Sequence, residues 1–461
     1  MNLVAELRNL LGAEASLIDD PAILPSYSHD QSQIAGHELP ACVLLARNVE
    51  EISKTMVFAH QHQIPIVARG AGSGLAGGAN AIANSIVISL EKMNSILEID
   101  PVNQIARVQP GVINLDLDSA VANHGLAYLP DPASREWSTI GGNVATNAGG
   151  MCCIKYGVTA NHIRAIEVVI GDGSVITLGH PVKKYVTGLN LMQLLIGSEG
   201  TLGIITEITV ALSPRPRPAT TLISTFADVA SAARAVPELV KLQPSMLEIV
   251  DNTTIQSVEQ WKPLGFENVG AVLIFQSDDG VAKCEQGREI ALAHGAHDST
   301  FSDDPRDSAD LLMLRKLAYP SLERTGAALL DDVCVPISAI SKLVEGVEHI
   351  SKQHNLTIGV FGHAGDGNMH PTIVYEHGNL EAEQRARKAF QEIIDLAQRL
   401  GGTASGEHGI GSIKIKSAAL ETGIKEQTLQ REIKRVFDPA GILNPGKKFL
   451  LPSGELQNTL R

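Results

Sequence analysis

The sequence predicts an α+β protein made of two parts that differ in character. Before residue 213 the chain is rich in glycine and in short β-branched runs separated by turn signals, which predicts many short strands and few helices. After residue 218, segments with helical apolar spacing alternate with strand-like runs, as in a layered α+β domain. The segment SPRPRP (213–218) lies between them. Its prolines exclude a helix or a central strand, so we expect a linker or an exposed crossing there.

The expected elements follow in chain order. The N-terminal segment MNLVAELRNLLG predicts a short amphipathic helix. In the first part, helices are expected at 49–62 and 114–124, and strands at 64–68, 85–90, 105–112, 165–170, 174–179 and 202–212. In the second part, helices are expected at 228–242, at 281–294 and from about 380 to the stop signal Gly401–Gly402, and strands at 270–275 and 357–362.

Composition and charge exclude several classes of protein. Of the 461 residues, 44% are hydrophobic and 19% are charged, which excludes wholesale disorder. The net charge of −14 argues against a nucleic-acid partner. The chain lacks a run long and apolar enough for a membrane span and a signal-peptide pattern, so we expect a cytoplasmic protein that meets a membrane only through a partner. The five cysteines lack CxxC spacing and are expected to be reduced thiols.

A glycine-rich loop follows the strand expected at 64–68. The segment RGAGSGLAGG has glycines at 70, 72, 74, 77 and 78. A Rossmann turn must open a helix, whereas here the strand at 85–90 follows, so we expect the loop to bridge two strands. Consecutive glycines let several backbone N–H groups converge on an anion. The alternative is an ordinary glycine-rich surface loop.

Two further segments of this kind favour a ligand over a surface loop. STIGGNVATNAGGMCCIKYG (138–157) and IGSEGTLGIITE (196–207) combine glycines with small polar side chains. Small residues let the backbone approach a flat ligand, and asparagine and threonine supply hydrogen bonds. Three such segments in the first part predict a large, polar, phosphate-bearing cofactor.

In this order, RGAGSGLAGG, IGGNVATNAGG and GSEGTLGIITE resemble the FAD-binding domain of the vanillyl-alcohol-oxidase and p-cresol-methylhydroxylase type, over residues 38–214. The resemblance implies a two-part FAD-binding domain at 1–214, in which a loop between strands holds the pyrophosphate. No histidine lies in that loop, so a non-covalent FAD is expected. The implied contacts are Arg69, Gly70, Ala71, Gly72, Ser73, Gly74, Leu75, Gly77 and Gly78 for the pyrophosphate, and Ser134, Gly141, Gly142, Asn143, Thr146, Asn147, Gly150, Ile204 and Ile205 for the flavin.

Histidines and a carboxylate gather in the second part. In GVFGHAGDGNMHPTIVY (359–375), the turn signal AGDGN joins two strands, so a hairpin would place His363 near His370. TASGEHGIG (403–411) adds Glu407 and His408 between glycines. Two histidines and a carboxylate suit a divalent metal such as zinc or manganese with positions open for substrate. The alternative is a set of surface or hydrogen-bonded core histidines.

GHAGDGNMH, GEHGIG and FDPAGILNPGK (437–447) resemble the FAD-linked D-2-hydroxyacid dehydrogenases, which include D-lactate dehydrogenase, D-2-hydroxyglutarate dehydrogenase and the FAD subunit of glycolate oxidase. The resemblance implies a substrate (cap) domain at 215–402 and a C-terminal helical segment at 403–461. It assigns His363, His370 and Glu407 as metal ligands, His408 as the base, Arg315 as the carboxylate clamp and Asn444 as a contact to the flavin. An exposed helix pair with Lys316 is the alternative for Arg315.

The implied reaction is oxidation of a D-2-hydroxy acid to the 2-oxo acid, with proton abstraction by His408 and hydride transfer to flavin N5. Three positions depart from the pattern of the 2-hydroxyglutarate enzymes, namely Tyr319, Leu330 and Thr372. Leu330 is apolar where the 2-hydroxyglutarate enzymes have a cation. The second carboxylate of 2-hydroxyglutarate would be unpaired there, which is costly when the group is buried. The sequence therefore predicts a monocarboxylate such as D-lactate or glycolate.

Other functions remain in competition with this one. The same chemistry would serve a FAD subunit of a multi-subunit glycolate oxidase that passes electrons to an iron–sulfur partner, since this chain has no cysteine set for a cluster. The electron acceptor is otherwise a quinone, a cytochrome or an electron-transfer flavoprotein, and a homodimer is compatible with the sequence. From other classes, a metal-dependent hydrolase and a non-catalytic nucleotide-binding protein are the distant alternatives.

Overall fold

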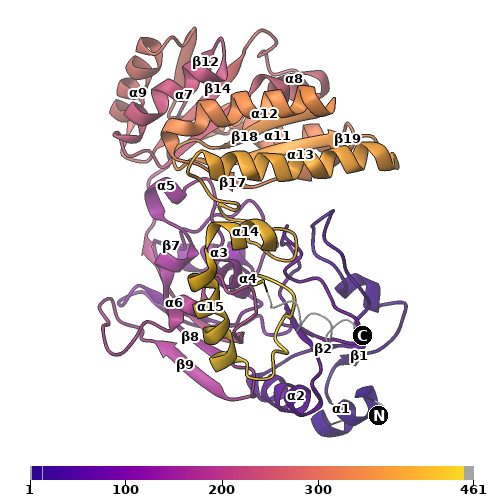
Figure 1. The fold of residues 1–461 in the computed structure, drawn as a ribbon. Helices are drawn as coiled ribbons and strands as arrows, with labels where there is room; N and C mark the ends of the chain where they lie inside the picture. The colour runs from indigo at the N-terminus through magenta and orange to yellow at the C-terminus, as the bar shows by residue number, and fades with distance from the viewer. Residues whose placement is uncertain (1–2, 13, 451–461) are drawn as a thin grey trace. The chain divides into compact units, whose positions relative to one another are not determined.

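The computed structural model describes residues 3–12 and 14–450, and the chain divides into two compact units (Figure 1). Unit 1 comprises Met1–Gly150, Val158–Arg215 and Glu407–Arg461, and unit 2 comprises Met151–Gly157 and Pro216–Gly406. The unit boundary after Arg215 falls within the proline-rich segment. Residues 407–450 fold with the first part of the sequence, whereas residues 403–406 remain in unit 2.

The first sheet of unit 1 holds the strands on either side of the glycine-rich loop. Its strand order is β1 (Leu17–Ile18), β2 (Cys42–Leu45), β4 (Ile86–Ser89) and β3 (Ile66–Arg69), and β4 is parallel to both β2 and β3. Helices α1 (Leu3–Leu11) and α2 (Val49–His62) belong to the same unit. The prediction of a helix at 49–62 is confirmed: the Asn48 side chain accepts the Glu51 N–H at its start, and Gln63 ends it in the left-handed conformation.

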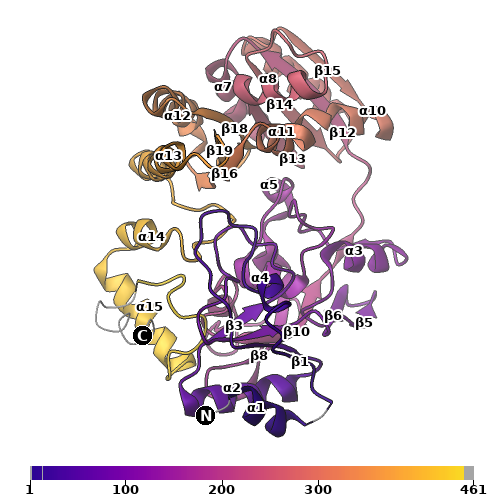
Figure 2. The same ribbon diagram turned by 90° about the vertical axis from the view of Figure 1, so that its right-hand side faces the viewer.

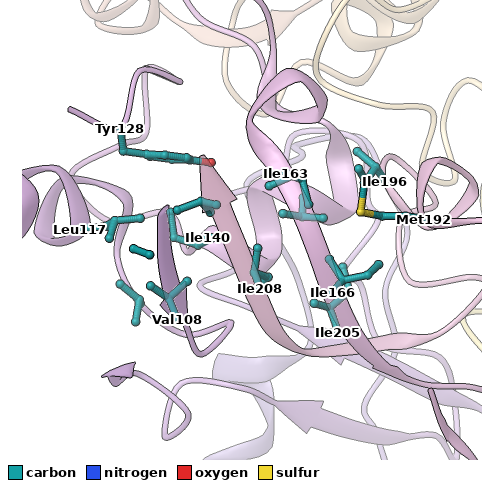
Figure 3. Packing of buried hydrophobic residues seen from close by; sticks show 14 of the residues in the cluster. Val108, Leu117, Tyr128, Ile140, Ile163, Ile166, Met192, Ile196, Ile205 and Ile208 are labelled. Carbon is teal, nitrogen blue, oxygen red and sulfur yellow. The ribbon is translucent and has the colours of Figure 1, made fainter. Parts of the chain in front are cut away.

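The second sheet of unit 1 is antiparallel and contains most of the strands expected before residue 213. Its order is β5 (Ile96–Asp100), β6 (Ile105–Val108), β10 (Ile204–Ala211), β8 (Ile163–Val169) and β9 (Val175–Gly179), while β7 (Leu126–Ala127) pairs separately with β11 (Ser213–Pro214). The remaining helices are α3 (Asn114–Ala122), α4 (Ile140–Thr146), α6 (Met192–Leu195), α14 (Ile415–Glu421) and α15 (Ile424–Phe437). Figure 3 shows the apolar core on this sheet, where Ile140 of α4 lies near Val108 and Leu117.

Helix α4 corrects the interpretation of 138–157 as a loop. The glycines at 141 and 142 lower helix propensity and so conceal the helix in the sequence. The Thr139 hydroxyl nevertheless accepts the Gly142 N–H at the N-cap, and Ile140 and Val144 are fully buried. Packing of these two apolar side chains stabilises a short helix that the local sequence disfavours.

Unit 2 is built on one eight-stranded sheet. Its order is β15 (Asp298–Ser302), β12 (Thr220–Phe226), β14 (Ala271–Ser277), β13 (Met246–Asp251), β18 (Thr357–His363), β19 (Asn368–Tyr375) and β16 (Ala327–Leu330), and β17 (Val333–Cys334) also pairs with β19. The helices are α5 (Cys153–Tyr156), α7 (Val229–Val240), α8 (Asn252–Trp261), α9 (Val281–Ala293), α10 (Pro305–Leu311), α11 (Met313–Glu323), α12 (Ile340–His354) and α13 (Leu380–Arg399). The helices expected near 228–242, 281–294 and 380–402 are confirmed as α7, α9 and α13.

Helices cover both faces of this sheet. On one face, Gly287 of α9 lies beside Leu222 and Phe275, and α12 lies alongside α13 (Figure 2). On the other face, α8 packs on β13 and β18, and α11 packs on β18 and β19. Ile223 and Ile274 belong to the apolar cluster on that face, because successive strand residues point to opposite faces. Unit 2 is therefore a layered α+β domain, as the sequence predicts.

The segment 151–157 belongs to unit 2 although it interrupts unit 1 in the sequence. Lys155 binds both Asp278 and Asp279, and the Tyr156 hydroxyl donates to Asp278. These contacts place α5 on the end of β14 and explain why a piece of the glycine- and asparagine-rich region folds with the second part. Among the described residues, no helix combines the length and apolar character that crossing a membrane requires.

Candidate functional site

The glycine-rich segments of unit 1 meet around one pocket, here called the glycine-lined pocket. Nine of its lining residues are glycines, so its wall is mainly backbone and can present N–H groups to a ligand. The loop after β3 leads to β4 with no intervening helix, as predicted. The predicted contacts that line the pocket are Arg69, Gly70, Ala71, Gly72, Ser73, Gly74, Leu75, Gly78, Ser134, Gly141, Gly142, Asn143, Thr146, Ile204 and Ile205.

Four residues predicted to contact the cofactor do not line the pocket. They instead hold the segments around it in place. Asn147 ends α4 in the left-handed conformation, and its side chain accepts the Ala160 N–H. Gly150 packs against the backbone of Asp131 so closely that a Cβ would come within 2.3 Å of the carbonyl oxygen. Gly77 has a φ of +78°, and a Cβ there would lie 2.5 Å from that of Ala35. The fourth, Asn444, is described next.

The C-terminal segment holds the glycine loop through hydrogen bonds from Asn444 and Lys447. The Asn444 side-chain amide donates to the carbonyl oxygens of Gly78 (2.9 Å) and Glu199 (2.7 Å). The Lys447 ammonium donates to the Gly78 carbonyl at 3.1 Å and also to that of Asn80. Burial lowers the pKa of Lys447 to about 7, although Asp30 and Glu199 oppose this shift. Polar contacts between residues 366 or more positions apart in sequence thus hold the loop in shape.

His408 and Glu407 also line the glycine-lined pocket. Their side chains are largely buried, and the His408 Nε2 lies 3.7 Å from Glu407 Oε1. The predicted base therefore borders the same pocket as the predicted flavin contacts, within unit 1. The distance from the histidine to the pyrophosphate loop in the sequence exceeds 300 residues, so only the fold brings them together.

A second set of functional side chains lies on the sheet of unit 2, and we call Glu248, Arg315, His363 and His370 the Glu248 cluster. Strands β18 and β19 form the predicted hairpin, with Phe361 paired to His370 and His363 paired to Asn368. The Nε2 atoms of the two histidines lie 3.3 Å apart. The prediction that the hairpin brings these histidines together is confirmed.

Glu248, on the neighbouring strand β13, binds two members of the cluster at once. Its Oε1 lies 2.7 Å from His363 Nδ1, and its Oε2 accepts from Arg315 Nε at 2.6 Å. Burial raises the pKa of this carboxyl, but the charges of His363 and Arg315 and their hydrogen bonds outweigh burial and lower the pKa to about 2. Glu248 is therefore an ionised carboxylate with no solvent exposure.

Arg315 is not half of an exposed pair with Lys316. Its side chain is only 14% exposed, and its guanidinium lies 4.8 Å from the centre of the Phe361 ring. Within the described residues its hydrogen bond to protein runs through Nε, which leaves both Nη groups for another acceptor. The helix α11 thus presents a cation to the face of the sheet that carries the histidines.

Asp332, between β16 and β17, joins Asn368 at the start of β19 to Ser405 at the end of unit 2. The Asn368 amide donates to Asp332 Oδ1 at 2.6 Å, and the Ser405 hydroxyl donates to Asp332 Oδ2 at 2.7 Å. Asp332 Oδ1 lies 4.0 Å from His370 Nδ1. Gly406 approaches Asn368 so closely that a Cβ would lie 2.2 Å from its amide nitrogen.

Sequence reasoning missed Glu248, Asp332 and Asn368. Glu248 lies in the apolar strand MLEIVD, and a carboxylate inside an otherwise buried strand is the signal that could have found it, because buried charges are nearly always paired. Asp332 lies in LLDDV, again next to a buried strand. Asn368 closes a turn and is expected there for its turn-forming property alone.

Comparison with known proteins agrees with this architecture. The family described as "FAD linked oxidases, C-terminal domain" matches residues 215–448, and the "FAD binding domain" family matches residues 40–179. The chain belongs to the FAD-linked oxidase family. This FAD-linked oxidase is accordingly a FAD-dependent oxidoreductase, and the glycine-lined pocket offers the backbone surface that a pyrophosphate and a flat ring system require.

The relatives are similar over nearly the whole chain. The oxidase is 38% identical over 433 residues to the glycolate oxidase subunit GlcD of Bacillus subtilis, with 92% of each chain covered. It is 35% identical to a D-lactate dehydrogenase of Anaerostipes hadrus, with 96% of this chain and 95% of that one covered. Among solved structures, p-cresol methylhydroxylase matches with a TM-score of 0.79 at 19% identity, over 96% of this chain and 95% of that one. The fold is thus of the p-cresol-methylhydroxylase type.

Proposed function

We propose that this oxidase converts a D-2-hydroxy monocarboxylate, such as D-lactate or glycolate, to the 2-oxo acid. The names of its relatives support a hydroxyacid substrate. The observation that carries the proposal is the Glu248 cluster, in which one buried carboxylate orients both a guanidinium and an imidazole. Such a set suits a small anion that needs a cationic anchor at one end and a polar group at the other.

Arg315 binds the substrate carboxylate in this proposal. Its Nε is committed to Glu248, so its rotation is restricted and both Nη groups keep a defined direction. Guanidinium groups bind carboxylates through such a fixed fork, and restriction of the donor in advance lowers the entropy lost on binding. The ring of Phe361 beneath the guanidinium keeps water from that side.

We further propose that His363, His370 and Glu407 hold a divalent metal, zinc or manganese. The two Nε2 atoms lie 3.3 Å apart, so both could bind one ion, and imidazole nitrogens are common zinc ligands. The contact of His363 Nδ1 with Glu248 turns Nε2 toward such an ion, as expected for a metal-bound histidine. Glu407 is the third ligand, as the resemblance to the FAD-linked D-2-hydroxyacid dehydrogenases implies.

His408 is the proposed base. A neutral imidazole is suited to take the hydroxyl proton near neutral pH, and His408 lines the glycine-lined pocket that would hold the flavin. The bound flavin supplies an acceptor for the hydride from the substrate carbon. The metal supplies a positive charge that favours loss of the hydroxyl proton. The protein residues anchor the carboxylate, remove the proton and keep the reacting carbon in place.

The surroundings of the Glu248 cluster favour a single carboxylate. Leu330 pairs directly with Thr372 across β16 and β19, and Thr372 lies two residues after His370 on the same face of the strand. Leu330 and Tyr319 pack in the apolar cluster on that face. Neither side chain carries a positive charge that could pair with a second carboxylate, and the cost of an unpaired buried carboxylate favours a monocarboxylate over 2-hydroxyglutarate.

The electrons must leave the flavin for an acceptor outside this chain. Relatives named as glycolate oxidase subunits favour the alternative in which the oxidase is one subunit and passes electrons to an iron–sulfur partner. A quinone, a cytochrome or an electron-transfer flavoprotein would serve an oxidase that works alone. The cytoplasmic location and the homodimer stay predictions, and membership of a flavoenzyme family argues against the hydrolase and the non-catalytic binding protein.

An anaerobic titration tests the proposal. The purified protein is expected to be yellow, and D-lactate or glycolate should bleach the flavin band while D-2-hydroxyglutarate does so poorly. Dialysis against a strong chelator should slow the bleaching, and added zinc or manganese should restore it. Equal bleaching by 2-hydroxyglutarate would contradict the monocarboxylate assignment, and no bleaching by any of the three acids would contradict the hydroxyacid assignment.

A further inference from the structure

Glu199 is an acidic residue whose backbone and carboxylate are both held by other segments of unit 1. It follows α6 in the motif GSEGT and lines the glycine-lined pocket. Its φ is +54°, in the left-handed region that non-glycine residues seldom adopt. Its N–H donates to the Ala145 carbonyl at 2.7 Å, at the end of α4, and its own carbonyl accepts from Asn444. An unusual backbone conformation persists only where several contacts determine it, as here.

The carboxylate of Glu199 binds the segment that carries His408. Oε1 accepts the Ile410 N–H at 2.9 Å, and Oε2 accepts the Gly411 N–H at 2.6 Å. Lys448 adds a charge-assisted bond to Oε1 at 3.0 Å. The side chain is only 4% exposed, so these bonds form away from water, where they are strongest.

Backbone hydrogen bonds also hold the far end of this segment: the Gly411 carbonyl accepts the Lys448 N–H at 2.9 Å, and the Ser412 N–H donates to the Ala76 carbonyl at 3.0 Å. The segment reads Gly-Glu-His-Gly-Ile-Gly from 406 to 411, and glycine contributes neither packing nor conformational restriction. Gly411 has a φ of +50° and lies against the Ala76 carbonyl, and a Cβ at Gly409 would come within 3.0 Å of Glu199 Oε1. The glycines therefore allow a close approach to Glu199 and to the glycine loop, and the two N–H bonds to one carboxylate hold the residues next to His408 against Glu199.

We propose that Glu199 is a positioning residue that holds His408 at the flavin. This inference rests on the proposed role of His408 and deepens it. Because the same residue forms part of the wall of the glycine-lined pocket, it joins cofactor binding to the placement of the base. FAD bound to this wall would restrict the backbone of Glu199. The hydrogen bonds of the Glu199 carboxylate would in turn restrict residues 408–411. The oxidase thus acquires a correctly placed base only when its cofactor is present.

The test compares Glu199→Gln with Glu207→Gln. Glu207 lies on β10 nearby in sequence and pairs with Arg107, outside the pocket lining. The amide of the introduced glutamine directs an NH₂ at one of two N–H donors, so one bond is replaced by a repulsive contact. Glu199→Gln is expected to bind FAD within about tenfold of wild type, yet to slow flavin reduction at saturating substrate by about 10²-fold, the cost of a misplacement of about 1 Å. Glu207→Gln should behave as wild type.

Hydrogen exchange supplies a readout that activity does not give. In wild type, addition of FAD should slow exchange of the Ile410 and Gly411 amides, and in Glu199→Gln these two amides should exchange at least about tenfold faster with FAD bound. Glu199→Asp keeps the charge on an arm one methylene shorter and should fall between the two. If Glu199→Gln does not fold, the effect of FAD on the two wild-type amides decides the question alone.

The outcomes separate this inference from the function on which it rests. A wild-type flavin that substrate bleaches, together with amides at 410 and 411 that are indifferent to FAD or to Glu199→Gln, would overturn the positioning role and leave the proposed function intact. Protected amides in a protein that no hydroxyacid bleaches would overturn the proposed function and leave the link between Glu199 and residues 408–411 standing.

Discussion

The glycine-lined pocket consists mainly of backbone groups, whereas the Glu248 cluster consists of side chains. The pocket is made mainly of backbone, with glycines that admit a close approach and unusual φ values. The cluster is made of long charged side chains from β13, α11, β18 and β19, all brought to one face of a sheet. A backbone site is encoded in contiguous motifs, whereas a side-chain site depends on which strands become neighbours. The first can therefore be found in a sequence, whereas Glu248, which joins the members of the second, becomes evident only in the fold.

The two sites also differ in how they tolerate change. At Gly70, Gly141 and Gly203 of the pocket an added Cβ would lie 2.5 Å from a neighbouring atom, so a side chain there would disturb the wall. In the cluster, each charge is balanced by its neighbours, so that removal of one leaves another buried and unpaired. The predictions below test this difference, from the largest expected effect to the smallest.

Replacement of His408 by alanine should have the largest effect on chemistry. Loss of the proposed base is expected to slow flavin reduction by about 10³-fold, within the range typical of general-base catalysis. The flavin spectrum should be retained, because the pocket is mainly backbone. Stopped-flow reduction under anaerobic conditions measures the rate, and His124→Ala, at an exposed histidine of unit 1, serves as the matched control. A rate within about threefold of wild type would remove His408 from the mechanism.

Replacement of Arg315 by methionine should weaken substrate binding by about 10²-fold, the value of a charge-assisted hydrogen-bonded pair of about 3 kcal/mol. It also leaves Glu248 without one of its two partners, so a fall in the melting temperature of unit 2 is expected. KM and thermal unfolding measure the two effects. Lys316→Met, at the exposed neighbour on α11, should change neither. An unchanged KM for the hydroxyacid would contradict the clamp.

Replacement of Leu330 by lysine should change specificity rather than rate. A cation opposite Thr372 is expected to raise kcat/KM for D-2-hydroxyglutarate about fivefold or more and to leave D-lactate or glycolate within about threefold of wild type, since an ion pair near a surface contributes about 1 kcal/mol. Leu330→Met keeps the volume and serves as the control. Specificity constants that do not change would show that this position lies away from the substrate.

The lowered pKa of Lys447, which lies behind the glycine loop, predicts how the free energy of unfolding depends on pH. The pKa of Lys447 in the folded protein is about 7, against 10.5 ordinarily, so the unfolded chain binds more protons between these values. The free energy of unfolding should therefore rise with pH across this window, by at most about 1.4 kcal/mol per pH unit from this group. Lys447→Met should remove that slope, and Lys425→Met, at an exposed lysine, should keep it. Urea unfolding of the apoprotein at about pH 7, 8 and 9 measures it, and equal slopes in all three proteins would contradict the shift.

The same contrast explains how much the sequence could predict. The helix at 49–62 has an asparagine cap and a regular apolar spacing, both local signals, and it was predicted at its observed bounds. The loop between β3 and β4 was predicted because the residues after it favour a strand. Helix α4 was missed because its glycines conceal a helix that depends on burial of Ile140 and Val144. Its stability comes from tertiary packing, which local propensity does not contain.

The site divides in the same way. The hairpin with His363 and His370 depends on a short turn between β18 and β19 and was predicted from its sequence. Glu248 lies 115 residues from His363, and Glu199 lies 211 residues from Ile410. No period or motif relates residues so far apart, because their proximity follows from the order of strands and the return of the chain. The signal available for Glu248 was an acidic residue in an apolar strand. It indicates that the carboxylate has a partner but does not identify which residue that partner is.

The order in which the chain forms the two units limits how unit 2 could be exchanged for another domain. Unit 2 is largely one continuous insertion between Arg215 and Glu407, so a different domain could be exchanged for it while the cofactor pocket was kept. Residues 151–157 contradict so simple an exchange, because Lys155 and Tyr156 bind Asp278 and would lose their partner. A chimera that replaces 216–406 must therefore carry its own version of the segment 151–157. Relatives that differ in substrate are expected to have changed the two stretches together.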